Sequence, residues 1–70
     1  MNVNIQYYMV VKDKKVPIVN PPKGFPSCID VSEHFRPGMS EDLALALAMG
    51  EHNRAKGLVL PRGILFEKAP

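Results

Sequence analysis

The chain has 70 residues, of which 46% are hydrophobic and 23% charged, and its formal net charge is +2. This composition excludes a wholly disordered chain, because such chains contain too few apolar residues to form a core. No run approaches the about 18 apolar residues of a membrane span, so no membrane partner is expected. A chain this short buries only roughly 60% of its unfolded surface. Residues 1–70 are therefore expected to form a single small domain that needs further support.

A single cysteine, Cys28, excludes the internal disulfides of small secreted domains and favours a reducing, cytoplasmic compartment. The first residues carry no basic stretch before an apolar run, so no signal peptide is expected. The metal-binding candidates Cys28, His34 and His52 form no CxxC or HxxxH motif. We therefore expect no metal and no cofactor, and the expected support is association with another chain.

Apolar and polar residues alternate over residues 2–12, with Val3, Ile5 and Tyr7 on one face. Period two with β-branched and aromatic residues predicts a half-buried strand. A charged turn over 12–15 and an apolar run over 16–19 then predict a hairpin. Its second strand is expected at a sheet edge, because Pro17 has no N–H to donate to a ladder.

Residues 20–39 contain four of the seven prolines and predict a long loop. Loops of this length in compact domains commonly carry function. Prolines keep such a segment extended and lower the entropy lost on binding. We therefore predict that Pro22 and Phe25 form part of a partner surface, with Phe25 as an anchor. The alternative is that Phe25 pins the loop to the helix.

Residues 41–56 form the one clear helix pattern. Ser40 is a good N-cap, acidic residues open the first turn, basic residues close the last, and Gly57 follows as the C-terminal cap. Beyond it, the apolar triplets 58–60 and 64–66 predict one interrupted strand, and residues 67–70 are expected to fray. The predicted fold is α+β: a small antiparallel sheet (hairpin plus C-terminal strand) with one α-helix packed on a face, in the order β-β-loop-α-β.

The helix carries two apolar stripes on nearly opposite sides, because residues follow each other at about 100° around its axis. Leu43 and Leu47 form one, which is expected to face the sheet. Leu45 and Met49 form the other, which either the 20–39 loop or a second chain must cover. We predict a homodimer through this second stripe. The expected core comprises Val3, Ile5, Tyr7, Met9, Ile18, Leu43, Leu47, Leu58, Leu60 and Ile64.

Two further groups of residues have chemical potential. Cys28 and His34 would make a thiolate pair if the loop brought them together, but a small buried hydrophobic residue is the favoured interpretation of Cys28. Basic residues near the hairpin would form a phosphate-contacting patch beside a tyrosine, or else a solvated hairpin tip that protects a strand edge. The candidate nucleic-acid contacts are Lys12, Lys14, Lys15 and Arg62.

No converging catalytic set is present, so the expected function is that of a non-enzymatic protein-binding module. The order strand–strand–helix–strand is similar to that of several small phage-encoded proteins that bind and inhibit host enzymes. This likeness lies in the architecture and in no shared motif, and it implies an inhibitor or adaptor of a larger enzyme or complex. The alternative is a small basic nucleic-acid-binding domain. The candidate protein-interface residues are Leu45, Met49, Gly50, His52, Pro22 and Phe25.

Overall fold

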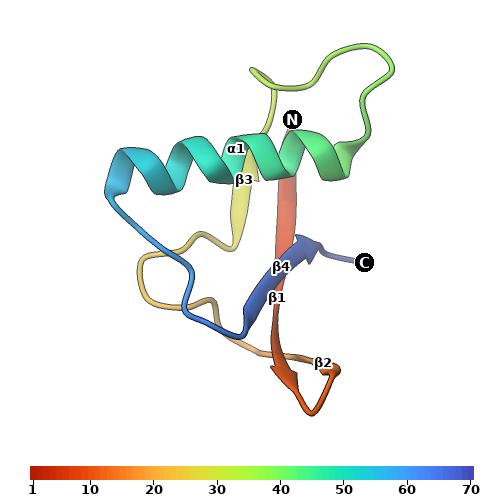
Figure 1. The fold of residues 1–70 in the computed structure, drawn as a ribbon. Coiled ribbons are helices and arrows are strands. Elements are labelled where there is room, and N and C mark those ends of the chain that lie inside the picture. Colours follow the sequence, from red (N-terminus) through yellow and green to blue (C-terminus); the bar gives the residue numbers. More distant parts are fainter.

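The computed structural model describes all 70 residues and shows an α+β fold with one helix on an antiparallel sheet (Figure 1). The predicted fold class is confirmed, and a short strand inside the 20–39 loop is added to it. The elements are β1 (Asn2–Val11), β2 (Lys14–Pro17), β3 (Cys28–Asp30), α1 (Glu41–Lys56) and β4 (Ile64–Lys68).

β1 is the central strand, and the other three strands all pair with it in antiparallel fashion. Tyr8 and Met9 have partners in both β2 and β4, so these two strands lie on opposite edges of β1. Asn4 pairs with Cys28 of β3 and also accepts a backbone hydrogen bond from Ala69, just beyond β4. β3 therefore lies on the same edge as β2, and the sheet is three strands wide.

The end of the chain is more regular than expected. Glu67 and Lys68 belong to β4, and the Ala69 N–H donates to the Asn4 carbonyl at 2.8 Å. The prediction that residues 67–70 fray is therefore wrong up to Ala69. The physical reason is the length of β1, whose ten residues offer ladder partners along its whole length.

The hairpin between β1 and β2 is confirmed. Its two loop residues, Lys12 and Asp13, have φ values of 49° and 65°. Two positive φ values in a two-residue loop define a type I′ turn, whose twist matches that of the flanking strands. All of β2 is exposed, as expected for an edge strand that ends in a proline.

The helix has the predicted bounds and caps. The Leu43 N–H donates to the Ser40 hydroxyl at 3.1 Å, and Gly57 closes the helix with a left-handed φ of 66°. The prediction of which stripe faces the sheet is wrong, however. Leu43 and Leu47 are 50% and 46% exposed, whereas Leu45 and Met49 are buried.

Two small residues explain this choice of face. Ala44 and Ala48 are buried on the same side as Leu45 and Met49, and their short side chains let the helix approach β1 closely. On the opposite side, Arg54 falls about midway between Leu43 and Leu47 around the helix axis. A long charged side chain in the middle of that stripe favours its contact with water.

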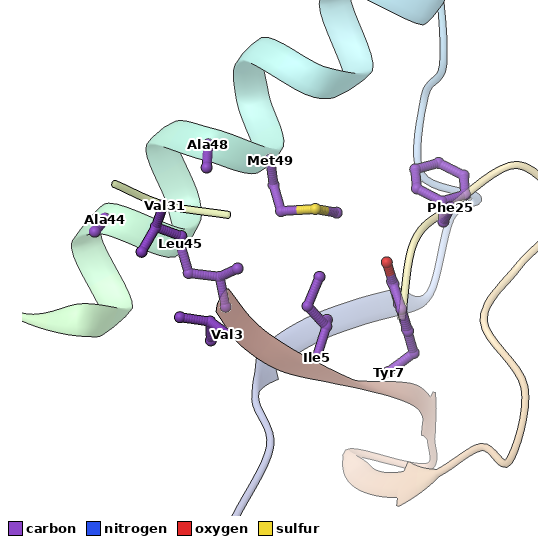
Figure 2. Close-up of a cluster of buried hydrophobic side chains, with 9 residues drawn as sticks. All are labelled: Val3, Ile5, Tyr7, Phe25, Val31, Ala44, Leu45, Ala48 and Met49. Carbon is purple, nitrogen blue, oxygen red and sulfur yellow. The ribbon is translucent and has the colours of Figure 1, made fainter. Parts of the chain in front are cut away.

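The core lies between α1, β1 and the 20–39 loop (Figure 2). Figure 2 shows Leu45 and Met49 pointing from the helix toward Val3 and Ile5 on β1. Met9 was expected in the core but is 44% exposed, because the hairpin end of β1 extends beyond the helix (Figure 1). The buried residues are Val3, Ile5, Tyr7, Phe25, Val31, Ala44, Leu45, Ala48 and Met49; Ile18, Leu58, Leu60 and Ile64 pack against them in part.

Phe25 holds the loop against the sheet, which favours the alternative that it pins the loop over a role as partner anchor. It is 8% exposed and contacts Tyr7 edge to face, with ring centroids 6.3 Å apart. The Tyr7 hydroxyl donates to the Pro26 carbonyl at 2.7 Å. Burial raises the pKa of Tyr7 to about 12, so the hydroxyl remains a donor even in alkaline solution.

The two leucine stripes of the helix are buried and exposed in the reverse of the predicted way, and they give a matched pair of substitutions. We expect Leu45→Ala to lower the free energy of unfolding by about 2–5 kcal/mol, enough to unfold much of a domain this small. Leu47→Ala should cost less than about 1 kcal/mol, since the side chain is already half in water. Urea denaturation followed by circular dichroism measures both. Equal costs at the two positions would contradict the observed burial.

The hydrogen bond of the Tyr7 hydroxyl gives a second matched pair of substitutions. Tyr7→Phe leaves the Pro26 carbonyl without its donor and should lower the free energy of unfolding by about 0.5–1.5 kcal/mol. Tyr8→Phe is the control, because the Tyr8 side chain makes no hydrogen bond and keeps its ring beneath Lys15. Thermal melting of the two variants compares them directly. A Tyr8→Phe loss as large as that of Tyr7→Phe would argue against the structural role given to the Tyr7 hydroxyl.

Candidate functional site

An open groove of about 690 Å³ lies between the first turns of α1 and the end of β4. Its apolar lining comes from Leu45 and Ala46 on the helix and Phe66 on the strand. Charged side chains form part of its lining. The full lining is Asp42, Leu45, Ala46, Phe66, Glu67, Lys68, Ala69 and Pro70.

The strand beside this groove has an unpaired outer edge. Backbone groups of successive strand residues point to opposite edges. Gly63 and Ala69, on either side of β4, bond to β1 through Val10 and Asn4, so the odd positions between them face β1 as well. The N–H and C=O groups of Phe66 and Lys68 therefore point away from β1, where no strand pairs with them.

β4 is the least protected of the outer edges. β2 has two lysines and a proline, features that discourage pairing with another strand, and β3 has only three residues. β4 has five residues, three of which, Ile64, Leu65 and Phe66, are apolar. An exposed edge of this kind is a template for an added strand.

The charges around the groove are partly compensated. The Lys68 ammonium lies 3.0 Å from the Glu41 carboxylate, and Lys15 forms an ion pair with Glu67 across the sheet. The hydrogen bond that the Lys15 ammonium donates to the Glu67 carboxylate raises the pKa of Lys15. Asp42 has no basic partner. The groove thus carries one uncompensated negative charge, near the start of the helix.

The predicted interface residues on the helix do not form one surface. Leu45 and Met49 face the core and are not exposed for the predicted dimer contact. Gly50 is exposed on the opposite side, next to Leu47, and a Cβ there would meet no atom within 4 Å. His52 is half-buried and hydrogen-bonds Asn53 at 3.0 Å. Pro22 is half-buried in the loop, near the pinned Phe25.

The predicted basic patch is divided. Lys14 and Lys15 are successive strand residues and point to opposite faces of the sheet. Lys15 is already paired with Glu67, and its ammonium lies 4.8 Å above the Tyr8 ring. Lys12 and Arg62 lie in exposed turns. Within the predicted nucleic-acid surface, the Lys15 ammonium and the Tyr8 ring therefore already contact each other.

The structure does not bring Cys28 and His34 together. Cys28 lies on β3 opposite Asn4 and is exposed, so its interpretation as a buried residue is wrong. The pleat explains this, because Asn4 and its partner face the side of the sheet away from the helix. The His34 side chain instead contacts Glu51 on α1.

The groove was not foreseen from the sequence. Its helix and strand were predicted separately, and β4 was expected to end before Glu67. The only signal was that Asp42 and Ala46 lie on one side of the helix at a spacing of four. No pattern in one sequence indicates which strand edge stays unpaired.

No protein-family model, curated protein or solved structure matches the chain. The single helix is too short and too polar to cross a membrane. The interpretation of the site therefore depends on its own geometry.

The turn after β3 predicts a measurable pH dependence. The Ser32 hydroxyl and backbone N–H donate to Asp30 at 2.6 and 2.9 Å, and with the terminal ammonium they lower the Asp30 pKa to about 2. A carboxyl whose pKa is lower in the folded state stabilises the fold fully above its unfolded pKa of about 3.9, and this contribution is lost as the pH falls toward 2. Ser32→Ala should raise the Asp30 pKa, measured by NMR titration of the carboxyl. A titration midpoint of about 3.9 for Asp30 in the wild type would contradict the hydrogen bonds that Ser32 donates to it.

Proposed function

We propose that this chain is a non-enzymatic protein-binding module, and that an extended segment of its partner adds as a strand to the outer edge of β4. The observation that carries the proposal is the unpaired edge at Phe66 and Lys68 beside the groove between α1 and β4. Strand addition takes its affinity from main-chain hydrogen bonds and its specificity from the side-chain pocket alongside them.

The exposed surface of the chain supports a binding role. A compact monomer of 7.8 kDa is expected to expose about 4,400 Å². This chain exposes 5068 Å² and buries only nine residues. Eleven large hydrophobic residues remain well exposed, including Leu43, Leu65 and Val59. Apolar area on this scale favours association with another protein.

The groove specifies the chemistry of the partner segment. The apolar side chains of Ala46 and Phe66 fit one aliphatic or aromatic side chain of an added strand. Asp42 fits a lysine or arginine on that strand, because it is the groove carboxylate without a basic partner. We therefore infer an extended partner segment that pairs one apolar with one basic residue. An inhibitor or adaptor of a larger enzyme or complex would bind in this way.

Self-association and nucleic-acid binding remain predictions. Leu45 and Met49 are buried, so a second copy would instead pair through β4 itself, and sedimentation velocity distinguishes such a dimer from a complex with a foreign segment. Nucleic-acid binding through Lys12, Lys14 and Arg62 would weaken steeply with salt, whereas strand addition would not.

A proline substitution tests the strand edge directly. Lys68→Pro removes an N–H that points outward and costs no hydrogen bond to β1, so the fold should persist as it does for edge prolines. Random peptides displayed on phage are selected on the wild-type chain, and the affinity of a selected peptide is then measured for each variant. We expect Lys68→Pro to weaken binding about tenfold or more.

Lys68→Ala is the matched control, because it removes the same side chain and its ion pair with Glu41 but keeps the N–H. It should bind the selected peptide within about twofold of the wild type. Equal affinity of the wild type and Lys68→Pro would contradict strand addition. Circular dichroism of both variants establishes that any loss is not due to unfolding.

A further inference from the structure

Three potential metal ligands converge on the side of α1 that faces the 20–39 loop. Glu33 and His34 lie in the turn after β3, and Glu51 lies on the helix. One donor atom from each residue lies within 4.8 Å of the other two. The three donors therefore come from two elements separated by 16 residues of chain between His34 and Glu51.

One distance within this cluster matches a zinc site. His34 Nε2 lies 3.3 Å from Glu51 Oε2. Zinc binds nitrogen and oxygen at about 2.0–2.2 Å in tetrahedral geometry. Two ligand atoms at the corners of such a tetrahedron are about 3.3–3.5 Å apart. The two side chains can thus bind one ion without moving apart, and a rotation of the Glu33 side chain would add the third ligand.

No lysine or arginine forms an ion pair with the carboxylates of the cluster, although Arg54 lines the same hollow. Each of the other carboxylates in an ion pair, Asp30, Glu41 and Glu67, faces an ammonium group. Glu33 has no basic partner, and Glu51 has only the His34 ring. With a neutral imidazole, the cluster carries two negative charges within 4.8 Å of each other. A divalent cation would neutralise both, whereas a single protonated histidine neutralises one.

The surroundings hold these ligands in place and leave room for an ion. The His34 and Phe35 N–H groups both donate to the Val31 carbonyl at 3.0 Å, and Val31 is fully buried. The His34 side chain is 22% exposed, so its ring is held against the helix. His34 and Glu51 line a hollow of about 290 Å³, which has space for the ion and its waters.

We propose that Glu33, His34 and Glu51 bind one Zn²⁺ ion, with at least one coordination position left open to water. An imidazole with two carboxylates favours zinc over Mg²⁺ and Ca²⁺, which prefer six or more oxygen ligands. The ion connects the long loop to the helix and thereby supplies the further support that a domain with nine buried residues needs. The absence of a spacing motif in the sequence is explained, because the ligands meet only after folding.

Zinc titration of the full chain tests this site. Isothermal calorimetry with ZnCl₂ should show saturable binding of one ion, and Zn²⁺ should raise the melting temperature. Both Glu51→Gln and His34→Gln should weaken zinc binding about tenfold or more and abolish the rise in melting temperature. The Cys28→Ser background removes the exposed thiol as a competing ligand. MgCl₂ at the same concentration should give neither effect.

Two substitutions on the same helix serve as controls. Asp42→Asn removes an exposed carboxylate, and His52→Gln removes the other histidine; neither residue belongs to the cluster. Both should bind zinc within about twofold of the wild type. The proposal is overturned if the wild type shows no saturable zinc binding, or if the two control substitutions weaken it as much as Glu51→Gln does. Circular dichroism of the zinc-free variants separates loss of ligand from loss of fold.

Discussion

The packing of Ala44, Leu45, Ala48 and Met49 onto the alternating residues of β1 holds the two layers of this molecule together (Figure 2). The two alanines set the distance, because a larger side chain at either position would move the helix away from the sheet. Leu45 and Met49 then fill the space over Val3 and Ile5. Each other feature of the molecule is placed by this contact, since the loop and β4 pack against a helix whose position is already fixed.

The helix covers only part of the sheet. Beyond Tyr7 the central strand continues toward the hairpin, and Met9, Val11 and Val16 are exposed there. On the other edge, β4 meets the first turns of α1 and the groove opens between them. A larger domain would cover these surfaces with a second helix or another strand. In a chain of 70 residues they remain available to a partner.

Local signals in the sequence were sufficient for the helix and the β1–β2 hairpin, and insufficient for β3 and for the contacts between elements. Ser40 and Gly57 define the ends of the helix through their own backbone and side-chain chemistry, which needs no tertiary information. The choice between the two leucine stripes was different. It depended on Ala44 and Ala48, which look neutral in a hydropathy pattern but decide how closely two layers approach.

The difference between local signals and tertiary contacts also explains why the proposed sites were not predicted. Residues 28–30 form a strand only because Asn2, Val3 and Asn4 offer them a free edge, and no propensity over three residues predicts that. Likewise Phe25 and His34 belong to one loop by sequence but have separate roles. The first is buried against Tyr7, and the second faces Glu51 on the helix. The contacts that form the two proposed sites join elements distant along the chain, so only the folded structure reveals them.

The two proposed sites lie on either side of one helix, and Ala46 borders both hollows. A ligand that binds only the folded state adds its binding free energy to stability. Because the core is small, such a contribution is a large share of the total. Zinc at Glu33, His34 and Glu51 would hold the loop against α1, and a partner strand on β4 would cover Ala46 and Phe66 from the other side. Association at the two proposed sites would thus replace a second layer, and the surfaces that weaken the isolated domain would be the ones that allow it to bind.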